Sequence, residues 1–167
     1  KDLAAKEAEL VVEAQKALAL LQDEGSSVAF PEVVDQMRQD MQTVELRLDA
    51  AEVGELTQGI EQDIIESLEE MIEALQREIE RSKDQQQQQQ QQQDGQPQDP
   101  ELLQTLSDLK LLRSMQLRVN RRTKRLGRLM DGEQAEQPDV VEQLQILSEG
   151  QRLMQEATYE LEKKKNK

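Results

Sequence analysis

The sequence predicts an all-α protein, an elongated antiparallel helical bundle of about five helices built as coiled-coil hairpins. Apolar residues recur every three or four positions along most of the 167-residue chain, which is the spacing that lines one face of a helix. Only Phe30 and Tyr159 are aromatic, whereas a compact α/β or all-β domain of this length normally buries several aromatic side chains. Charged residues make up 34% of the chain and hydrophobic residues 35%, a balance typical of long helices that bury narrow apolar stripes.

Residues 1–84 are predicted to form an N-terminal helical region of three helices. The first helix is expected to end at Gly25, because glycine tolerates the left-handed conformation of a helix C-cap. Pro31 then suits the first turn of the second helix, where its missing N–H is not needed. Gly54 and Gly59 predict a break, kink or tight turn before the third helix, since a glycine inside a helix costs about 1 kcal/mol relative to alanine.

Each of these three helices carries an apolar stripe that is predicted to be buried. In the first helix the stripe is Leu3, Leu10, Ala14, Ala17 and Leu21. In the second it is Val34, Met37, Met41, Val44, Leu48 and Ala51. In the third it is Ile65, Leu68, Ile72, Leu75 and Ile79. Ile64 and Met71 widen the third stripe, which predicts contact with more than one neighbouring helix.

Residues 85–100 are predicted to be a Gln-rich flexible linker. Nine consecutive glutamines occupy residues 85–93, and neither they nor the polar residues that follow offer an apolar side chain to bury. Glutamine is also a fair helix former, so one alternative is that the tract extends the third helix, otherwise expected to fade at residues 81–84, by a turn or two. The other alternative is an aggregating β element.

Residues 101–167 are predicted to form a C-terminal helical hairpin. Pro100 suits the first turn of the fourth helix, Gly132 ends that helix, and Pro138 begins the fifth. The fourth stripe is Leu102, Thr105, Leu109, Leu112, Gln116, Val119, Thr123, Leu126 and Met130; the fifth is Val140, Leu144, Leu147, Gln151, Met154, Thr158 and Leu161. The polar members are expected to hydrogen-bond across the hairpin and fix its register. The alternative is a stripe that stays partly exposed until a partner helix binds.

The residue types that most enzymes depend on are missing from this chain. It has no His, no Cys and no Trp, which excludes Ser-His-Asp and Cys-His catalysis, thiolate or imidazole metal sites, and disulfides. Carboxylate pairs such as Glu69 and Glu70 are best interpreted as a solvated helix face. We therefore predict no enzyme, no catalytic, metal-binding or cofactor-binding residue, no cofactor and no small-molecule substrate. No apolar run approaches the roughly 18 residues that span a bilayer.

The most informative feature is an island of positive charge in the fourth helix. Between Leu109 and Met130 the chain carries eight basic residues and no acid, although its net charge is −14. The candidate docking residues are Lys110, Arg113, Arg118, Arg121, Arg122, Lys124, Arg125 and Arg128. The island is either a docking face for an anionic partner or an internal partner for the acids of the third helix, Glu61, Asp63, Glu66, Glu69, Glu70, Glu73, Glu78 and Glu80. We expect partial internal pairing, with the exposed remainder recognising an acidic protein.

Nucleic acid is the less favoured anionic partner for this island. The net charge of −14 repels phosphate. The island also lacks an aromatic side chain on which a base could stack. A protein partner is therefore expected, and a homo-oligomer is compatible with the apolar stripes.

Two stretches resemble a particular family. Residues 54–75, GELTQGIEQDIIESLEEMIEAL, and residues 106–126, LSDLKLLRSMQLRVNRRTKRL, are similar to the hallmark segments of an uncharacterised family of exported planctomycete coiled-coil proteins. These proteins accompany TolQ/ExbB-type proton channels and ExbD/TolR-type partners. The resemblance covers about a quarter of the chain and brings no catalytic residues with it. It implies a periplasmic or otherwise extracytoplasmic location.

The leading functional hypothesis is a non-enzymatic extracytoplasmic helical scaffold or adaptor that accompanies a proton-driven, TolQ/ExbB-type energy-transducing complex. The long apolar stripes, the charge-segregated helix and the missing catalytic residue types support the scaffold, and the resemblance supplies the complex. The alternative is a cytoplasmic coiled-coil regulator whose basic helix docks an acidic partner or nucleic acid.

Overall fold

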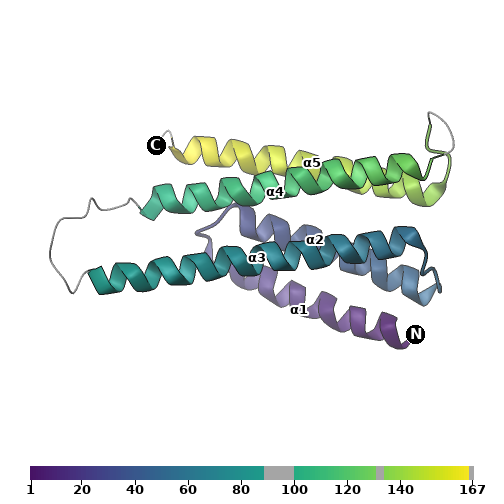
Figure 1. Ribbon diagram of the computed structural model, residues 1–167, viewed down its shortest axis with the longest axis horizontal. Coiled ribbons are helices and arrows are strands. Elements are labelled where there is room, and N and C mark those ends of the chain that lie inside the picture. Colours follow the sequence, from purple (N-terminus) through teal and green to yellow (C-terminus); the bar gives the residue numbers. More distant parts are fainter. Residues whose placement is uncertain (89–99, 131–133, 166–167) are drawn as a thin grey trace.

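The computed structural model describes residues 1–88, 100–130 and 134–165, and all regular structure in these ranges is helical. Helices α1 (Asp2–Glu24) and α2 (Ala29–Asp49) form one hairpin, and α3 (Glu55–Gln88) follows. Helices α4 (Pro100–Arg128) and α5 (Pro138–Lys165) form a second hairpin. Successive helices run in alternating directions along one elongated bundle (Figure 1). The prediction of an all-α helical bundle is confirmed.

Helix α2 lies at the centre of the bundle, because it packs against all four other helices. Its predicted apolar stripe is largely correct, since Val34, Met37, Met41 and Val44 are buried. The stripe ends earlier than predicted: Ala51 follows the helix and has a φ of 61°, which takes it into the left-handed region. Gly25 at the end of α1 also adopts the left-handed C-cap conformation, with φ 69°, as predicted.

The start of α2 is tied to α4 by hydrogen bonds. Ser27 Oγ accepts a hydrogen bond from the Phe30 N–H at 3.0 Å, and it donates to Asp108 of α4 at 2.5 Å. The other carboxylate oxygen of Asp108 accepts a hydrogen bond from the Val28 N–H at 3.2 Å. Ser27 and Asp108 are both buried, so this link joins two segments that lie 81 residues apart in the sequence.

The predicted stripe of α1 is correct only in part, at Ala14, which is buried, and at Leu21, which packs against the core. Leu3 and Leu10 are 62% and 50% exposed, whereas the buried residues of the helix are Ala4, Ala14 and Leu18. The physical reason is that, among the described helices, α1 packs only on α2. Small alanine side chains let two helices approach closely, and the larger Leu3 and Leu10 remain exposed.

The predicted buried stripe of α3 is wrong, because its residues face solvent rather than the interior of the bundle. Its five members are all exposed: Ile65, Leu68, Ile72, Leu75 and Ile79. Ile64 and Met71, which the sequence identified as widening residues, are buried together with Ile60. Helix α3 meets α2 and α4 but not α1 in the described chain, so only the side of the wide stripe that faces α2 and α4 is covered.

The ends of α3 agree with the prediction in part. The helix begins at Glu55 and contains Gly59, so Gly54 lies in the turn before it and Gly59 does not break it. The helix continues through residues 85–88, which agrees with the alternative that the glutamine tract extends it by a turn. The remainder of the predicted linker, residues 89–99, lies outside the described residues.

The C-terminal hairpin follows its predicted stripes more closely. Leu112 and Leu126 of α4 are buried, although Leu109 is exposed. In α5 the buried apolar residues include Val140, Leu147, Met154 and Leu161.

The register prediction for this hairpin is confirmed in part. Gln116 and Gln151 exchange two amide hydrogen bonds of 2.8 Å across the hairpin, as predicted. Thr123 and Thr158 are different, because each donates its hydroxyl to a carbonyl four residues earlier in its own helix. Of these four predicted polar residues, only Gln116 and Gln151 therefore bond across the hairpin.

Candidate functional site

A buried polar cluster joins α4 to three other helices. The Arg122 guanidinium donates to Asp40 of α2 at 2.7 Å and to the side-chain oxygen of Gln143 of α5. Its Nε lies 3.8 Å from Asp63 of α3. Arg122 is 3% exposed, and the other three residues are buried as well. One arginine thus fixes the relative positions of four helices, since breaking a buried charge pair leaves an uncompensated charge.

Two neighbouring arginines complete this cluster. Arg125 donates to both carboxylate oxygens of Asp63, and Arg118 donates to the Ser67 hydroxyl. Burial raises the pKa of the Asp40 carboxyl above its ordinary value, and the adjacent Arg122 opposes this rise. Burial likewise lowers the pKa of Arg118. Most of its polar atoms are paired within the cluster, whereas Nε of Arg122 and Nε of Arg125 are buried without a hydrogen-bond partner among the described residues.

The predicted docking residues therefore separate into two groups. Arg118 and Arg122 are buried, and Arg125 is half-buried on Asp63, so these three face the bundle interior. Internal pairing with acids of α3 is confirmed for Arg122, Arg125 and Arg121, of which the last lies 2.7 Å from Glu66. The sequence could not have separated the two groups by charge alone.

The remaining basic residues form one exposed face of α4, which we call the basic stripe. It consists of Lys110, Arg113, Arg121, Lys124 and Arg128, all exposed. Their spacing of three, eight, three and four residues keeps them on one side of a helix, next to the side that carries the buried arginines. Leu106 and Leu117 are exposed on the same side. Within the described part of the chain, Arg121 is the one member of the stripe that forms an ion pair.

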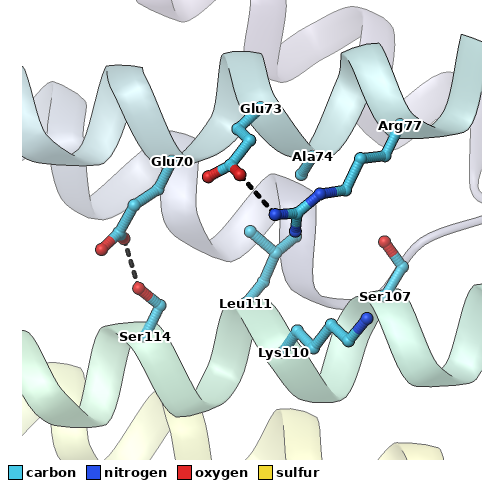
Figure 2. Close-up of a pocket in the computed structure, with 8 residues that line it drawn as sticks. All are labelled: Glu70, Glu73, Ala74, Arg77, Ser107, Lys110, Leu111 and Ser114. Carbon is cyan, nitrogen blue, oxygen red and sulfur yellow. Dashed lines mark hydrogen bonds and ion pairs between the residues drawn. The ribbon is translucent and has the colours of Figure 1, made fainter.

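A small polar pocket lies between α3 and α4 beside the basic stripe. Figure 2 shows Glu70 and Glu73 of α3 above Lys110 and Ser114 of α4. Glu70 accepts a hydrogen bond from the Ser114 hydroxyl, and Glu73 is paired with Arg77 of its own helix. Two of the acids expected to neutralise the island are thus engaged elsewhere, which leaves Lys110 available to solvent.

A second surface, which the sequence did not predict as a site, is an apolar groove of about 780 Å³ between α1 and α3. One wall carries Leu10, Ala14, Ala17, Leu20 and Leu21; the other carries Ile64, Ile65, Leu68, Met71, Ile72 and Leu75; the floor is Phe30, Val34, Met37 and Met41 of α2. The signal was present in the sequence as two apolar stripes that a single neighbour could not cover.

The rim of the apolar groove is acidic. The charged residues that line it are Glu7, Glu13 and Glu61, and no lysine or arginine is among its described lining residues. Burial raises the pKa of Glu7, and repulsion from Glu61 and Glu45 adds to the rise. The apolar groove therefore differs in charge sign from the basic stripe on α4.

No group of acidic side chains in the described ranges has the arrangement of a metal site. None of the described helices combines the length and the hydropathy needed to cross a bilayer. Comparison of the chain with protein-family models, with curated proteins and with solved structures finds no match.

Proposed function

We propose that this protein is a non-enzymatic helical adaptor or scaffold that docks on an acidic protein surface through the basic stripe of α4. The observation that carries the proposal is the division of one helix into two basic faces. Arg118 and Arg122 are buried in the bundle, whereas five other cations point outward in a chain of net charge −14. Internal contacts account for the first face, and within the described ranges only Arg121 of the second face has an ion-pair partner.

The neighbours of the basic stripe favour a protein rather than a nucleic acid as its partner. Leu106 and Leu117 give the stripe an apolar component, and protein interfaces combine buried apolar contacts with charged ones. The only aromatic side chains are Phe30, which is buried in α2, and Tyr159 in α5. A base-stacking platform on α4 is therefore absent from the sequence itself.

The proposed setting comes from the family resemblance of residues 54–75 and 106–126. It favours an extracytoplasmic, periplasmic adaptor that accompanies a TolQ/ExbB-type proton channel. The alternative is a cytoplasmic coiled-coil regulator that uses the same basic stripe. Cell fractionation separates the two settings, because the first places the protein in the periplasmic fraction and the second places it in the cytoplasmic fraction.

Site-specific photo-crosslinking tests the docking proposal in the cells that produce the protein. A photo-reactive residue at Leu117 should yield a covalent adduct with one acidic protein. The same residue at Leu46, which is 70% exposed on α2, should not. Replacing Lys110, Arg113, Lys124 and Arg128, which form no ion pair with the described residues, by glutamine should abolish the Leu117 adduct, since long-range attraction depends on those charges. An adduct that survives this change, an adduct with nucleic acid, or none at all would contradict the proposal.

A further inference from the structure

We propose that the apolar groove between α1 and α3 binds an amphipathic helix of a partner protein, one that carries Lys or Arg beside its apolar stripe. This second docking surface lies on different helices from the basic stripe and does not depend on it. A protein with both surfaces bridges two partners, an acidic one at α4 and a basic helix at α1 and α3.

Both walls of the apolar groove expose large side chains to water. Ile65, Leu68, Ile72 and Leu75 project from α3, and Leu10 and Leu20 project from α1. Scattered exposed leucines are ordinary, but a contiguous set of them over a buried apolar floor marks an interaction surface. Met37 and Met41 lie in that floor, and methionine adapts its shape to whatever packs on it.

The shape of the apolar groove fits a helix. Helices α1 and α3 both pack on α2, and in the described chain they do not pack on each other. Three helices in this arrangement leave the position of a fourth open. The α3 wall runs from Glu61 to Leu75, which at 1.5 Å per residue is a length of about 21 Å, or four helical turns. Grooves of this kind take an amphipathic helix through residues spaced i, i+3, i+4 and i+7.

The charge of the rim selects the kind of helix. Glu7, Glu13 and Glu61 border the apolar lining, and a helix with flanking cations would pair with them as its apolar stripe is buried. A second copy of this chain placed groove against groove would instead bring the same three acids together. Each copy would also bring a net charge of −14, and like charges placed opposite each other across an interface oppose binding. A basic partner helix is the better complement.

A pair of synthetic peptides tests the proposal on the full chain. One is an 18-residue helix with a leucine stripe flanked by lysines, and the other replaces those lysines with glutamates. Fluorescence anisotropy should show the lysine peptide binding at least about tenfold more tightly, equivalent to about 1.4 kcal/mol. This preference should shrink as salt is added, because partly exposed pairs are screened.

Variants of the chain locate the binding. The double change Ile65→Gln and Ile72→Gln should weaken binding of the lysine peptide about tenfold or more, and both residues are exposed, so the fold should be preserved. Leu46→Gln is the matched control, because Leu46 is exposed outside the apolar groove, and it should leave binding unchanged. Glu13→Gln with Glu61→Gln should reduce the preference for lysine without exposing new apolar surface.

Four results would overturn the proposal. They are equal binding of the two peptides, an equal loss of binding with Leu46→Gln, no binding of either peptide, and a concentration-dependent dimer that disappears with Ile65→Gln and Ile72→Gln. The last result, measured by analytical ultracentrifugation, would assign the apolar groove to a second copy of the chain. Because none of these measurements involves α4, they leave the proposed role of the basic stripe to its own test.

Discussion

Replacing Arg122 with alanine should be among the most damaging single changes in the bundle. Arg122 supplies the one cation that pairs with Asp40 among the described residues. Asp40 is 7% exposed, so the change would leave a carboxylate in the interior without its hydrogen-bonded cation, and Arg118 would be a remaining nearby positive charge. Losing one member of a buried ion pair costs about 3–5 kcal/mol. That is a large part of the roughly 5–15 kcal/mol that stabilises a typical domain.

The contacts that remain around Arg122 after its removal help to set this loss of unfolding free energy. Asp63 keeps Arg125 as a partner when Arg122 is removed, so only Asp40 and Gln143 lose a contact without compensation. A second change, Asp40→Asn, removes the orphaned charge and should restore a large part of the lost free energy. Urea unfolding followed by circular dichroism measures each variant, and the pair of single changes with the double change forms a thermodynamic cycle.

The pH dependence of the Arg122→Ala variant follows from the raised pKa of Asp40. Between the ordinary carboxyl pKa, about 3.8, and the raised pKa of the folded state, the folded protein binds more protons at Asp40 than the unfolded chain does. Stability from this group is therefore greatest below the ordinary value and is lost as pH rises through the raised one. Removing Arg122 takes away an opposing influence and widens this window. Relative to the Asp40→Asn double variant, the Arg122→Ala protein should regain stability as pH is lowered.

Lys124→Ala is the control for this experiment, because Lys124 is exposed and belongs to the basic stripe. It should change the unfolding free energy by no more than about 0.5 kcal/mol. If Arg122→Ala cost as little as Lys124→Ala, or if Asp40→Asn gave no recovery in the double variant, the structural role of the buried cluster would be refuted.

Two further pairs of substitutions test the packing, each made of a test variant and its control. Gly59→Ala should destabilise the protein despite the better helix propensity of alanine, because the new Cβ would lie 2.7 Å from Nε of Arg125 and displace the guanidinium from Asp63. Gly127→Ala is the control. Its new Cβ meets no atom within 4 Å, so this change should be neutral or stabilising by up to about 1 kcal/mol. Met41→Asp should lower the unfolding free energy by several kcal/mol, because Met41 is 4% exposed. Gln42→Asp, on the exposed side of α2, should be near neutral. Equal changes in melting temperature for the two variants would contradict the assigned core face of α2.

The sequence predicted the helices better than it predicted their buried sides. Gly25 and Pro31 marked the end of α1 and the start of α2 correctly, because capping is decided by local backbone chemistry. Helix α2 was also predicted well, because it is covered on most sides and its most regular stripe is the buried one. In α1 and α3 the periodicity identified an apolar face, but nothing local indicates whether a neighbour covers it.

The candidate sites also depend on which helices become neighbours, and the local sequence does not indicate this. The island of basic residues was visible from charge counting, and its partial pairing was expected. Which arginines turn inward depends on Asp40, which lies 82 residues away from Arg122 in the sequence, and on Asp63 of a third helix. Contacts of that kind require the tertiary arrangement. The apolar groove was not predicted for a related reason. The exposed apolar residues of α1 and α3 that line it were expected to be buried against neighbouring helices, and in the bundle no neighbouring helix among the described residues covers them.

The measurement that tests the account most directly compares both faces of α4 in one experiment. The outer variant carries Lys110→Gln, Arg113→Gln, Lys124→Gln and Arg128→Gln, and the inner variant carries Arg122→Gln alone. Thermal unfolding is recorded for each, together with the crosslinked adduct formed from Leu117. The account predicts that the outer variant keeps the melting temperature of the parent and loses the adduct, while the inner variant melts at a markedly lower temperature. An outer variant that unfolds early or retains the adduct, or an inner variant as stable as the parent, would contradict it.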